Sequence, residues 1–234
     1  GAGLGAAAAS WLIERSALRA LRDRWFEPRA ALGMTLLITW VLVQAYPQPM
    51  LMATGRVLQP LALLANDAPG ASLSFAARHF VLVEALGVAA ASTAAALILL
   101  DIARPTAPRV LLVLATLGAA IGVKSLATAW LLGEAETLHW LSSGAQGGLV
   151  FAALAIAASS VMAPTRRLTA ALIALLVALA LANFAPENAY YQVMLGRWDQ
   201  GPWINFNRLL SAAAVAWPFV ALVHLLDRRR GARS

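Results

Sequence analysis

The sequence predicts an all-α integral membrane protein, a bundle of six transmembrane helices preceded by part of another helix. Hydrophobic residues make up 61% of the chain and charged residues 12%, whereas the apolar share of soluble domains is about 45–50%. Several apolar segments approach the length of about 20 residues that a helix needs to cross the hydrocarbon core of a bilayer. Most arginines lie in every second connection between these segments. Lipid is therefore the expected surrounding for most of the chain.

The first element is an apolar run of helical character over residues 1–13. At about 1.5 Å per residue it extends roughly 20 Å, which is less than a hydrocarbon core of about 30 Å. It lacks the charged region that precedes the apolar part of a secretory signal. We interpret it as the end of an upstream transmembrane helix. An Arg-rich loop over 14–29 follows, and then a six-helix membrane domain over 30–226 and a basic tail over 227–234.

Six segments of the membrane domain are predicted to span the bilayer, because each is apolar and close to the required length of about 17–25 residues. Two longer connections, over 47–79 and 185–207, separate some of them. The predicted spans cover residues 30–46, 80–100, 110–132, 147–163, 168–184 and 209–226.

The arginines predict the orientation of these helices. Thirteen of them lie in the first, third and fifth loops and in the tail, whereas four lie in the alternate loops. Because cytoplasmic loops carry the excess of Lys and Arg, we expect a cytoplasmic C-terminus and a periplasmic loop around Ala68. The net charge of +7 is spread over short clusters between apolar runs, which argues against a nucleic-acid partner. The thirteen residues are Arg15, Arg19, Arg22, Arg24, Arg29, Arg104, Arg109, Arg166, Arg167, Arg228, Arg229, Arg230 and Arg233.

The two longer loops lie on the predicted outer side. Residues 47–79 contain Gly55 and Pro60, which interrupt the apolar run, so we expect a short amphipathic piece in the interface rather than a span. Residues 185–207 are rich in aromatic side chains, which favours an anchoring belt at headgroup depth and leaves a ligand-stacking surface as the alternative. A short helix is expected over 188–196. The candidate binding surface comprises Glu187, Asn188, Tyr190, Tyr191, Trp198, Asp199, Trp203, Asn205 and Asn207.

Most catalytic signatures are not found in the sequence. There is no cysteine, which excludes thiolate catalysis and Cys-based metal sites. Neither HExxH nor GxSxG occurs, and GAAIGVKS over 118–125 lacks the spacing of a phosphate-binding loop. We therefore favour a non-enzymatic protein and assign no catalytic residue and no cofactor. Gly118 and Gly122 instead form a GxxxG pair, which predicts close packing against another helix.

Two charged residues lie deep in the predicted spans. At about 1.5 Å per residue, Glu84 is expected roughly 6 Å below the outer boundary and Lys124 about 9 Å below it, on consecutive antiparallel helices. An unpaired charge in the hydrocarbon core is unfavourable. We therefore expect an intramembrane ion pair between Glu84 and Lys124, as a structural clamp in preference to a substrate or proton site.

The three histidines have the chemistry of metal ligands but not the spacing. His79 and His139 fall on the predicted outer side near acidic residues, and His224 falls at the inner end. No two ligands show a recurrent short spacing, so no metal site is predicted.

Two parts of the chain resemble the VanZ-like family, specifically longer proteobacterial members with extra helices after the VanZ domain. GAGLGAAAASWL over 1–12 resembles the Gly-rich helix that closes a VanZ domain. NFAPENAYYQVMLGRWDQGPWINFNRLL over 183–210, followed by WPFVALVHLL over 217–226, is similar to the tail of those members and is the more specific match. The resemblance implies a bacterial inner-membrane protein connected with low-level glycopeptide resistance. The polar motifs of the VanZ domain do not occur in this chain, so no functional residue is carried over.

These observations favour a protein of the cell envelope that contacts lipid, a lipid-linked glycan precursor or a glycopeptide antibiotic. The alternative is a structural or assembly subunit of a larger membrane complex, which small-residue helix faces support. A transporter or membrane enzyme comes third, because deep charges are few and no inverted repeat is evident. Membrane lipids are the expected partners, and other membrane proteins are expected under the alternative.

Overall fold

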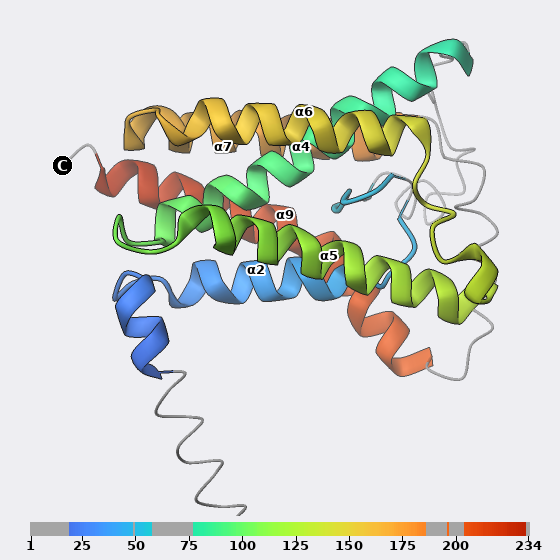
Figure 1. Ribbon diagram of the computed structural model, residues 1–234, viewed down its shortest axis with the longest axis horizontal. Coiled ribbons are helices and arrows are strands. Elements are labelled where there is room, and N and C mark those ends of the chain that lie inside the picture. The colour runs from blue at the N-terminus through green and yellow to red at the C-terminus, as the bar shows by residue number, and fades with distance from the viewer. Residues whose placement is uncertain (1–18, 49, 58–76, 186–195, 197–203, 233–234) are drawn as a thin grey trace, which may run out of the picture.

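The computed structural model describes residues 19–48, 50–57, 77–185, 196 and 204–232, and this part of the chain is a helical bundle (Figure 1). Residues 19–25 form a short helical stretch before the first long element. The upstream helix expected over residues 1–13 lies outside the described residues. The elements are α2 (Ala31–Val43), α4 (Ala77–Ile102), α5 (Arg109–Leu132), the 3-10 helix η1 (Glu134–Glu136), α6 (Ser143–Ser160), α7 (Pro164–Phe184) and α9 (Ile204–Gly231).

Five of the helices are long and apolar enough to cross a membrane. This confirms the predicted multi-pass helical bundle for five of its six spans. Their apolar stretches are His79–Ile102, Arg109–Leu132, Ser143–Ser160, Pro164–Phe184 and Arg208–Gly231.

The predicted span over residues 30–46 is not a complete transmembrane helix. Helix α2 has 13 residues, or about 20 Å at about 1.5 Å per residue, which does not reach across a core of about 30 Å. Beyond Val43 the backbone tightens, because the amides of Gln44 and Ala45 each donate to the carbonyl three residues earlier. Pro47 follows, and its missing N–H prevents the helix from continuing.

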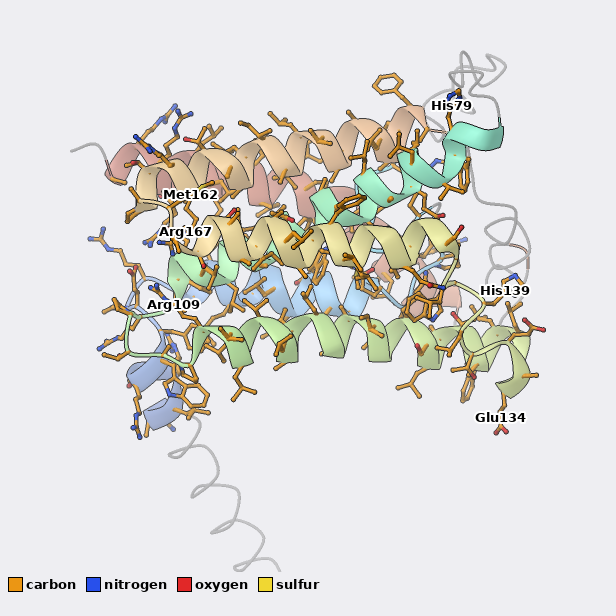
Figure 2. The ribbon with its side chains drawn as sticks, turned by 45° about the horizontal axis from the view of Figure 1, so that its top comes forward. His79, Arg109, Glu134, His139, Met162 and Arg167 are labelled. Atoms are coloured by element: carbon orange, nitrogen blue, oxygen red, sulfur yellow. The ribbon has the colours of Figure 1, made fainter. Side chains whose placement is uncertain are left out.

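The loops predicted to face the cytoplasm meet at one end of the bundle, which we call the arginine-rich end. The α4–α5 and α6–α7 connections, residues 19–25 and the end of α9 all lie there (Figure 1). Figure 2 places Arg109 and Arg167 at this end, and His79 and His139 at the opposite end. The alternation of arginines along the sequence is thus reproduced in space. Which face of the membrane each end occupies stays a prediction.

Helix α4 is the best buried of the spans, and α5 is the most exposed. α4 packs most extensively against α6 and α7 and also contacts α2 and α5. Its alanine-rich second half is buried throughout residues 94–100. Small side chains let helices approach closely in lipid, where association relies on packing rather than on the hydrophobic effect. By contrast, α5 exposes large apolar side chains along its whole length, including Val110, Leu114, Leu126 and Trp130.

The close contact between α6 and α4 depends on glycine. A Cβ atom on Gly148 would lie 2.6 Å from the Val88 Cβ atom and 2.7 Å from a backbone carbonyl oxygen of α4, and Gly144 also faces α4. The pair Gly144–Gly148 is therefore a GxxxG contact that brings two helices together. A Cβ atom on Gly118 or Gly122 would meet no atom within 4 Å. The packing predicted for that pair is therefore not observed within the described residues.

Candidate functional site

A non-helical segment lies buried inside the helical bundle. It comprises residues 44–57, of which residue 49 is not described, and we call it the re-entrant segment. It leaves the end of α2 and runs back between the helices (Figure 1). Residues 50–53 are almost completely buried, so the expectation of an amphipathic piece in the interface is wrong for them. Residues 58–76 lie outside the described part of the chain.

The re-entrant segment reaches the middle of the membrane domain at Gly55. A Cβ atom on Gly55 would overlap side chains of Leu179 in α7 and Pro218 in α9. Leu179 lies 12 residues after Arg167 and Pro218 lies 10 residues before Arg228, so both are roughly 15–18 Å from the arginine-rich end. Gly55 has φ +83°, a conformation that side chains other than glycine rarely adopt. The position therefore requires glycine for both space and backbone conformation.

A proline in α9 leaves a carbonyl free to bind Gly55. Pro218 lies inside α9 and has no N–H, so the carbonyl of Ala214, four residues earlier, has no donor within the helix. The Gly55 amide donates to this carbonyl oxygen at 2.8 Å. The hydrogen bond that proline removes from α9 is thus replaced by one from the re-entrant segment. Such replacement is needed at membrane depth, where no bulk water satisfies backbone groups.

Asn183 of α7 binds the same part of the re-entrant segment. Its Nδ2 donates to the Gly55 carbonyl oxygen at 2.9 Å and to the Leu179 carbonyl oxygen at 2.8 Å. Its Oδ1 accepts from the Val57 amide at 2.8 Å. Both backbone polar groups of Gly55 are therefore hydrogen-bonded. No role for Asn183 or Pro218 was predicted from the sequence. An amide side chain and a proline inside predicted spans are nevertheless signals of irregular backbone nearby.

Lys124 of α5 contacts the beginning of the re-entrant segment. The residue is 0% exposed, and its Nζ donates to the Tyr46 carbonyl oxygen at 3.3 Å. No ion pair with a carboxylate is formed by Lys124 within the described residues. Lys124 lies roughly 21 Å from Val110 along α5, at about 1.5 Å per residue. The ammonium group is therefore in the half of the bilayer remote from the arginine-rich end.

Glu84 is buried against the start of α6. It is 1% exposed, and its Oε2 accepts a hydrogen bond of 2.6 Å from the Ser142 hydroxyl. Ser142 is the N-cap of α6, and the same hydroxyl oxygen accepts from the Ala145 amide at 3.0 Å. The positive end of a helix dipole stabilises a nearby negative charge. A hydroxyl group and a helix N-terminus therefore compensate the Glu84 carboxylate.

The predicted ion pair between Glu84 and Lys124 is not formed between these two described residues. Similar depth on neighbouring helices was the basis of the prediction, but depth does not determine the direction in which a side chain points. Glu84 faces α6, and Lys124 faces the re-entrant segment. Ser142 could have been identified from the sequence, because a serine just before an apolar helical run is a typical N-cap.

Two glutamines place further polar groups in the interior. Gln44 Nε2 donates to the Trp40 carbonyl oxygen and Gln48 Nε2 to the Val43 carbonyl oxygen, both at 2.9 Å. The Oε1 atoms of both glutamines are buried and have no hydrogen-bond partner among the described residues. Together with Lys124, the re-entrant segment therefore presents donors and acceptors inside a protein that lipid surrounds.

The candidate binding surface of the outer loop lies almost entirely outside the described residues, as does most of the helix expected over 188–196. Asn205 and Asn207 lie in the first turns of α9, but their side chains are not described. This surface therefore stays a prediction. The residues outside the described part are Glu187, Asn188, Tyr190, Tyr191, Trp198, Asp199 and Trp203.

The histidines are dispersed. His139 Nδ1 lies 2.8 Å from Glu136 Oε2, and both side chains are about half exposed. His79 lies apart from His139 at the same end of the bundle (Figure 2). His224 is buried near Gly33, in the other half of the bundle. In the described ranges, no three His, Asp or Glu side chains form a group that could hold a metal ion.

No protein-family model, curated protein or solved structure matches this chain. Its interpretation therefore depends on its own geometry. That geometry describes a multi-pass helical membrane protein with a buried re-entrant segment and a buried lysine beside it.

Proposed function

We propose that this chain is a non-enzymatic, VanZ-like protein of the bacterial inner membrane that binds the anionic part of an amphiphile through Lys124. The amphiphile is a membrane lipid or a lipid-linked glycan precursor, since both carry phosphate. The observation that supports this proposal is the complete burial of Lys124 beside the re-entrant segment. The resemblance of residues 183–210 and 217–226 to VanZ-like proteins supports the location in the cell envelope.

A buried ammonium group needs more compensation than Lys124 receives from Tyr46. Insertion scales penalise a lysine at the bilayer centre by about 2.5–3.5 kcal/mol, and the Tyr46 carbonyl at 3.3 Å offers a partial charge through one long hydrogen bond. A phosphate oxygen would offer a full negative charge and a shorter, stronger hydrogen bond. Ionisable residues inside membrane domains commonly mark ligand pathways for this reason.

Lys124 is fully buried, but it lies on the helix that has the largest lipid-facing surface. α5 is the most exposed span, with Leu126 and Trp130 about three-quarters exposed close to Lys124 in the sequence. The re-entrant segment lies on the side of α5 that faces the interior of the bundle. Its irregular backbone is tolerated at membrane depth because protein surrounds it. Because Lys124 itself is 0% exposed, the proposal requires α5 to move aside on binding, so that the chains of the amphiphile stay in lipid along α5 while its anionic group reaches Lys124.

Native mass spectrometry of the purified full chain tests this proposal. We expect wild-type protein to retain an anionic phospholipid or lipid-linked precursor, and Lys124→Met to lose it. Glu84→Gln is the matched control, because it removes the other buried charge, which is already bonded to Ser142. Equal retention by wild type and Lys124→Met would contradict the proposal. If the protein retained no phosphate-carrying lipid and instead bound a glycopeptide antibiotic in a way that depends on Lys124, the antibiotic would be the ligand and the proposed phosphate ligand would be wrong.

The alternative function is that of an assembly subunit, and Gly118 and Gly122 are the observation that favours it. Within the described residues these glycines contact no other helix, so α5 carries a GxxxG notch that another transmembrane helix could enter. We expect Gly118→Ile with Gly122→Ile to release a co-purifying membrane protein if this function is correct. Trp130→Leu is the control, because it changes an exposed side chain of α5 about two turns beyond the notch and on another part of the helix surface.

A further inference from the structure

Arginines from two other helices bind backbone carbonyls at the C-terminal end of α4 and in the residue that follows it. Arg167 Nη1 donates to the Leu100 carbonyl oxygen at 3.4 Å, and Arg109 Nη2 donates to the Ala103 carbonyl oxygen at 2.9 Å. The last carbonyls of a helix have no partner within the helix, and cations near them are favourable. Ala103 directly follows α4, so the two carbonyls lie about one turn apart and bring both guanidinium groups to the same end of α4. Arg109 lies within electrostatic reach of Arg167, and Figure 2 shows both at the same end of the bundle.

The acidic residues near this helix end are bonded to a different arginine. Arg228 Nε donates to Asp101 Oδ2 at 2.7 Å, and Arg228 Nη2 donates to Glu27 Oε2 at 2.8 Å. Asp101 is also within electrostatic reach of Arg167, but its ion pair is with Arg228. In the part of the chain that the structure describes, neither Arg109 nor Arg167 forms an ion pair with a carboxylate.

Arg109 and Arg167 therefore combine like charge with spare hydrogen-bonding capacity. A guanidinium group has five N–H donors. The Nε atoms of Arg109 and Arg167 are buried and have no hydrogen-bond partner among the described residues, so the donors left for a ligand at the surface are on the Nη atoms. Arg167 makes its second hydrogen bond to the Met162 carbonyl oxygen at 3.3 Å, which is long for a charged donor. The N–H donors of a guanidinium group match the geometry of a phosphate group, and two such groups at one end of the bundle supply two positive charges.

Apolar side chains exposed to lipid adjoin these arginines. Val110 follows Arg109 and is 75% exposed, and Leu111 and Leu114 continue the same exposed surface of α5. Val161, at the α6–α7 connection, is 88% exposed. Charged groups at the end of a span and apolar side chains along it are the two features that a phospholipid needs, because its phosphate and its acyl chains bind at different depths.

We propose that Arg109 and Arg167 bind the phosphate of an anionic phospholipid from the leaflet at the arginine-rich end. The acyl chains lie along the exposed surface of α5 that begins at Val110 and Leu111. Under the predicted orientation this is the cytoplasmic leaflet, whose anionic lipids attract basic residues. The site is separate from Lys124, which lies in the other half of the bilayer.

The test is a titration of the purified full chain with phosphatidylglycerol and with phosphatidylcholine, followed by native mass spectrometry. We expect wild type to prefer phosphatidylglycerol, and Arg109→Gln and Arg167→Gln each to weaken its binding about fivefold, from about 1 kcal/mol per basic residue. Arg230→Gln, an exposed residue at the same end, removes the same charge and is expected to weaken it less than about twofold. An equal loss in all three variants, or no lipid preference in wild type, would overturn the proposal.

A second variant keeps the test valid if loss of the carbonyl contacts unfolds the arginine variants. Val110→Glu puts a carboxylate on an exposed position beside Arg109 and leaves the bonds to α4 in place. We expect it to abolish the preference for phosphatidylglycerol, whereas Leu126→Glu, exposed near the other end of α5, should retain the preference. Full retention by Val110→Glu would overturn the proposal.

Discussion

Buried charges in this membrane domain are compensated by hydroxyl and backbone groups. Glu84 binds the Ser142 hydroxyl at the start of α6, and Lys124 binds the Tyr46 carbonyl. Neither contact neutralises a full charge, but each supplies a dipole that is already held in place by the fold. Removing the partner of one buried charge should therefore destabilise that charge and leave the other buried charge unaffected.

Glu84 and Ser142 should be coupled energetically, and Glu84 and Lys124 should not. In a double-mutant cycle of Glu84→Gln and Ser142→Ala we expect a coupling on the order of 0.5–3 kcal/mol, because the two side chains are in contact. The cycle of Glu84→Gln and Lys124→Met should be additive within about 0.5 kcal/mol. The free energy of unfolding in detergent is the quantity to measure. A large coupling between Glu84 and Lys124 would restore the ion pair that the sequence predicted.

Gly148 should tolerate no side chain, whereas Gly122 should tolerate one. Gly148→Ala places a methyl group against Val88 and a backbone carbonyl of α4, and such overpacking typically costs about 1–3 kcal/mol. Gly122→Ala meets open space and should leave the free energy of unfolding unchanged or raise it slightly, because Ala favours helix. Thermal unfolding of the two variants in the same detergent compares them directly. Equal stability of both variants would be inconsistent with close packing of α6 on α4.

At the scale of elements, the re-entrant segment and the proline-containing helix α9 are stabilised together. Pro218 removes a helical hydrogen bond, and Gly55 replaces it by donating to the Ala214 carbonyl. Asn183 of α7 completes the hydrogen bonding of the segment. Three elements far apart in the chain thus satisfy one another's backbone groups, which is the condition for non-helical structure at membrane depth.

The re-entrant segment should be inaccessible from either side of the membrane. The chain has no cysteine, so a single introduced thiol can be labelled specifically. Thr54→Cys, in a residue that is 9% exposed, should react slowly with a membrane-impermeant maleimide in intact cells and in inverted vesicles. Leu138→Cys, near η1 and 58% exposed, is the control and should react fast from one side. Rapid labelling of Thr54→Cys would place the segment in the interface, as the sequence alone suggested.

At the scale of the whole molecule, charge is distributed between the two ends of the bundle. The arginine-rich end holds the network of Arg228, Asp101 and Glu27 and the contacts of Arg109 and Arg167 to α4. These arginines were expected from the sequence to act as topology signals. In the structure they also bind the end of α4, so orientation in the membrane and helix packing depend partly on the same residues.

Reporter fusions should place the two ends on opposite sides of the membrane. A fusion after Arg230 should be cytoplasmic, because positively charged loops are retained on that side. An insertion within Glu134–Glu136, at the other end of the bundle, should be periplasmic. Alkaline phosphatase activity and green fluorescence report the two locations. A periplasmic C-terminal fusion would reverse the proposed orientation and would move the lipid site of Arg109 to the outer leaflet.

The sequence by itself determined that the chain lies in a membrane and where five of its spans run. Hydropathy and charge act locally. About 20 apolar residues form all their backbone hydrogen bonds within one helix, and the arginines of a loop favour the cytoplasmic side for that loop. These properties need no knowledge of neighbouring segments, which is why the span over 168–184 is predicted well. The Gly144–Gly148 motif was also present in the sequence, but a GxxxG pattern alone does not indicate whether a helix faces protein or lipid.

Tertiary structure alone decided what each polar group contacts. Gly55 meets Asn183 and Ala214, which lie more than 100 residues away in the chain, and Glu84 meets Ser142 at a separation of 58 residues. The rotation of each helix about its axis determines such contacts, and that rotation depends on the packing of all its neighbours at once. Residues 44–57 are buried for the same reason: the free carbonyl in α9 and the amide of Asn183 satisfy a backbone that would otherwise have to remain in water.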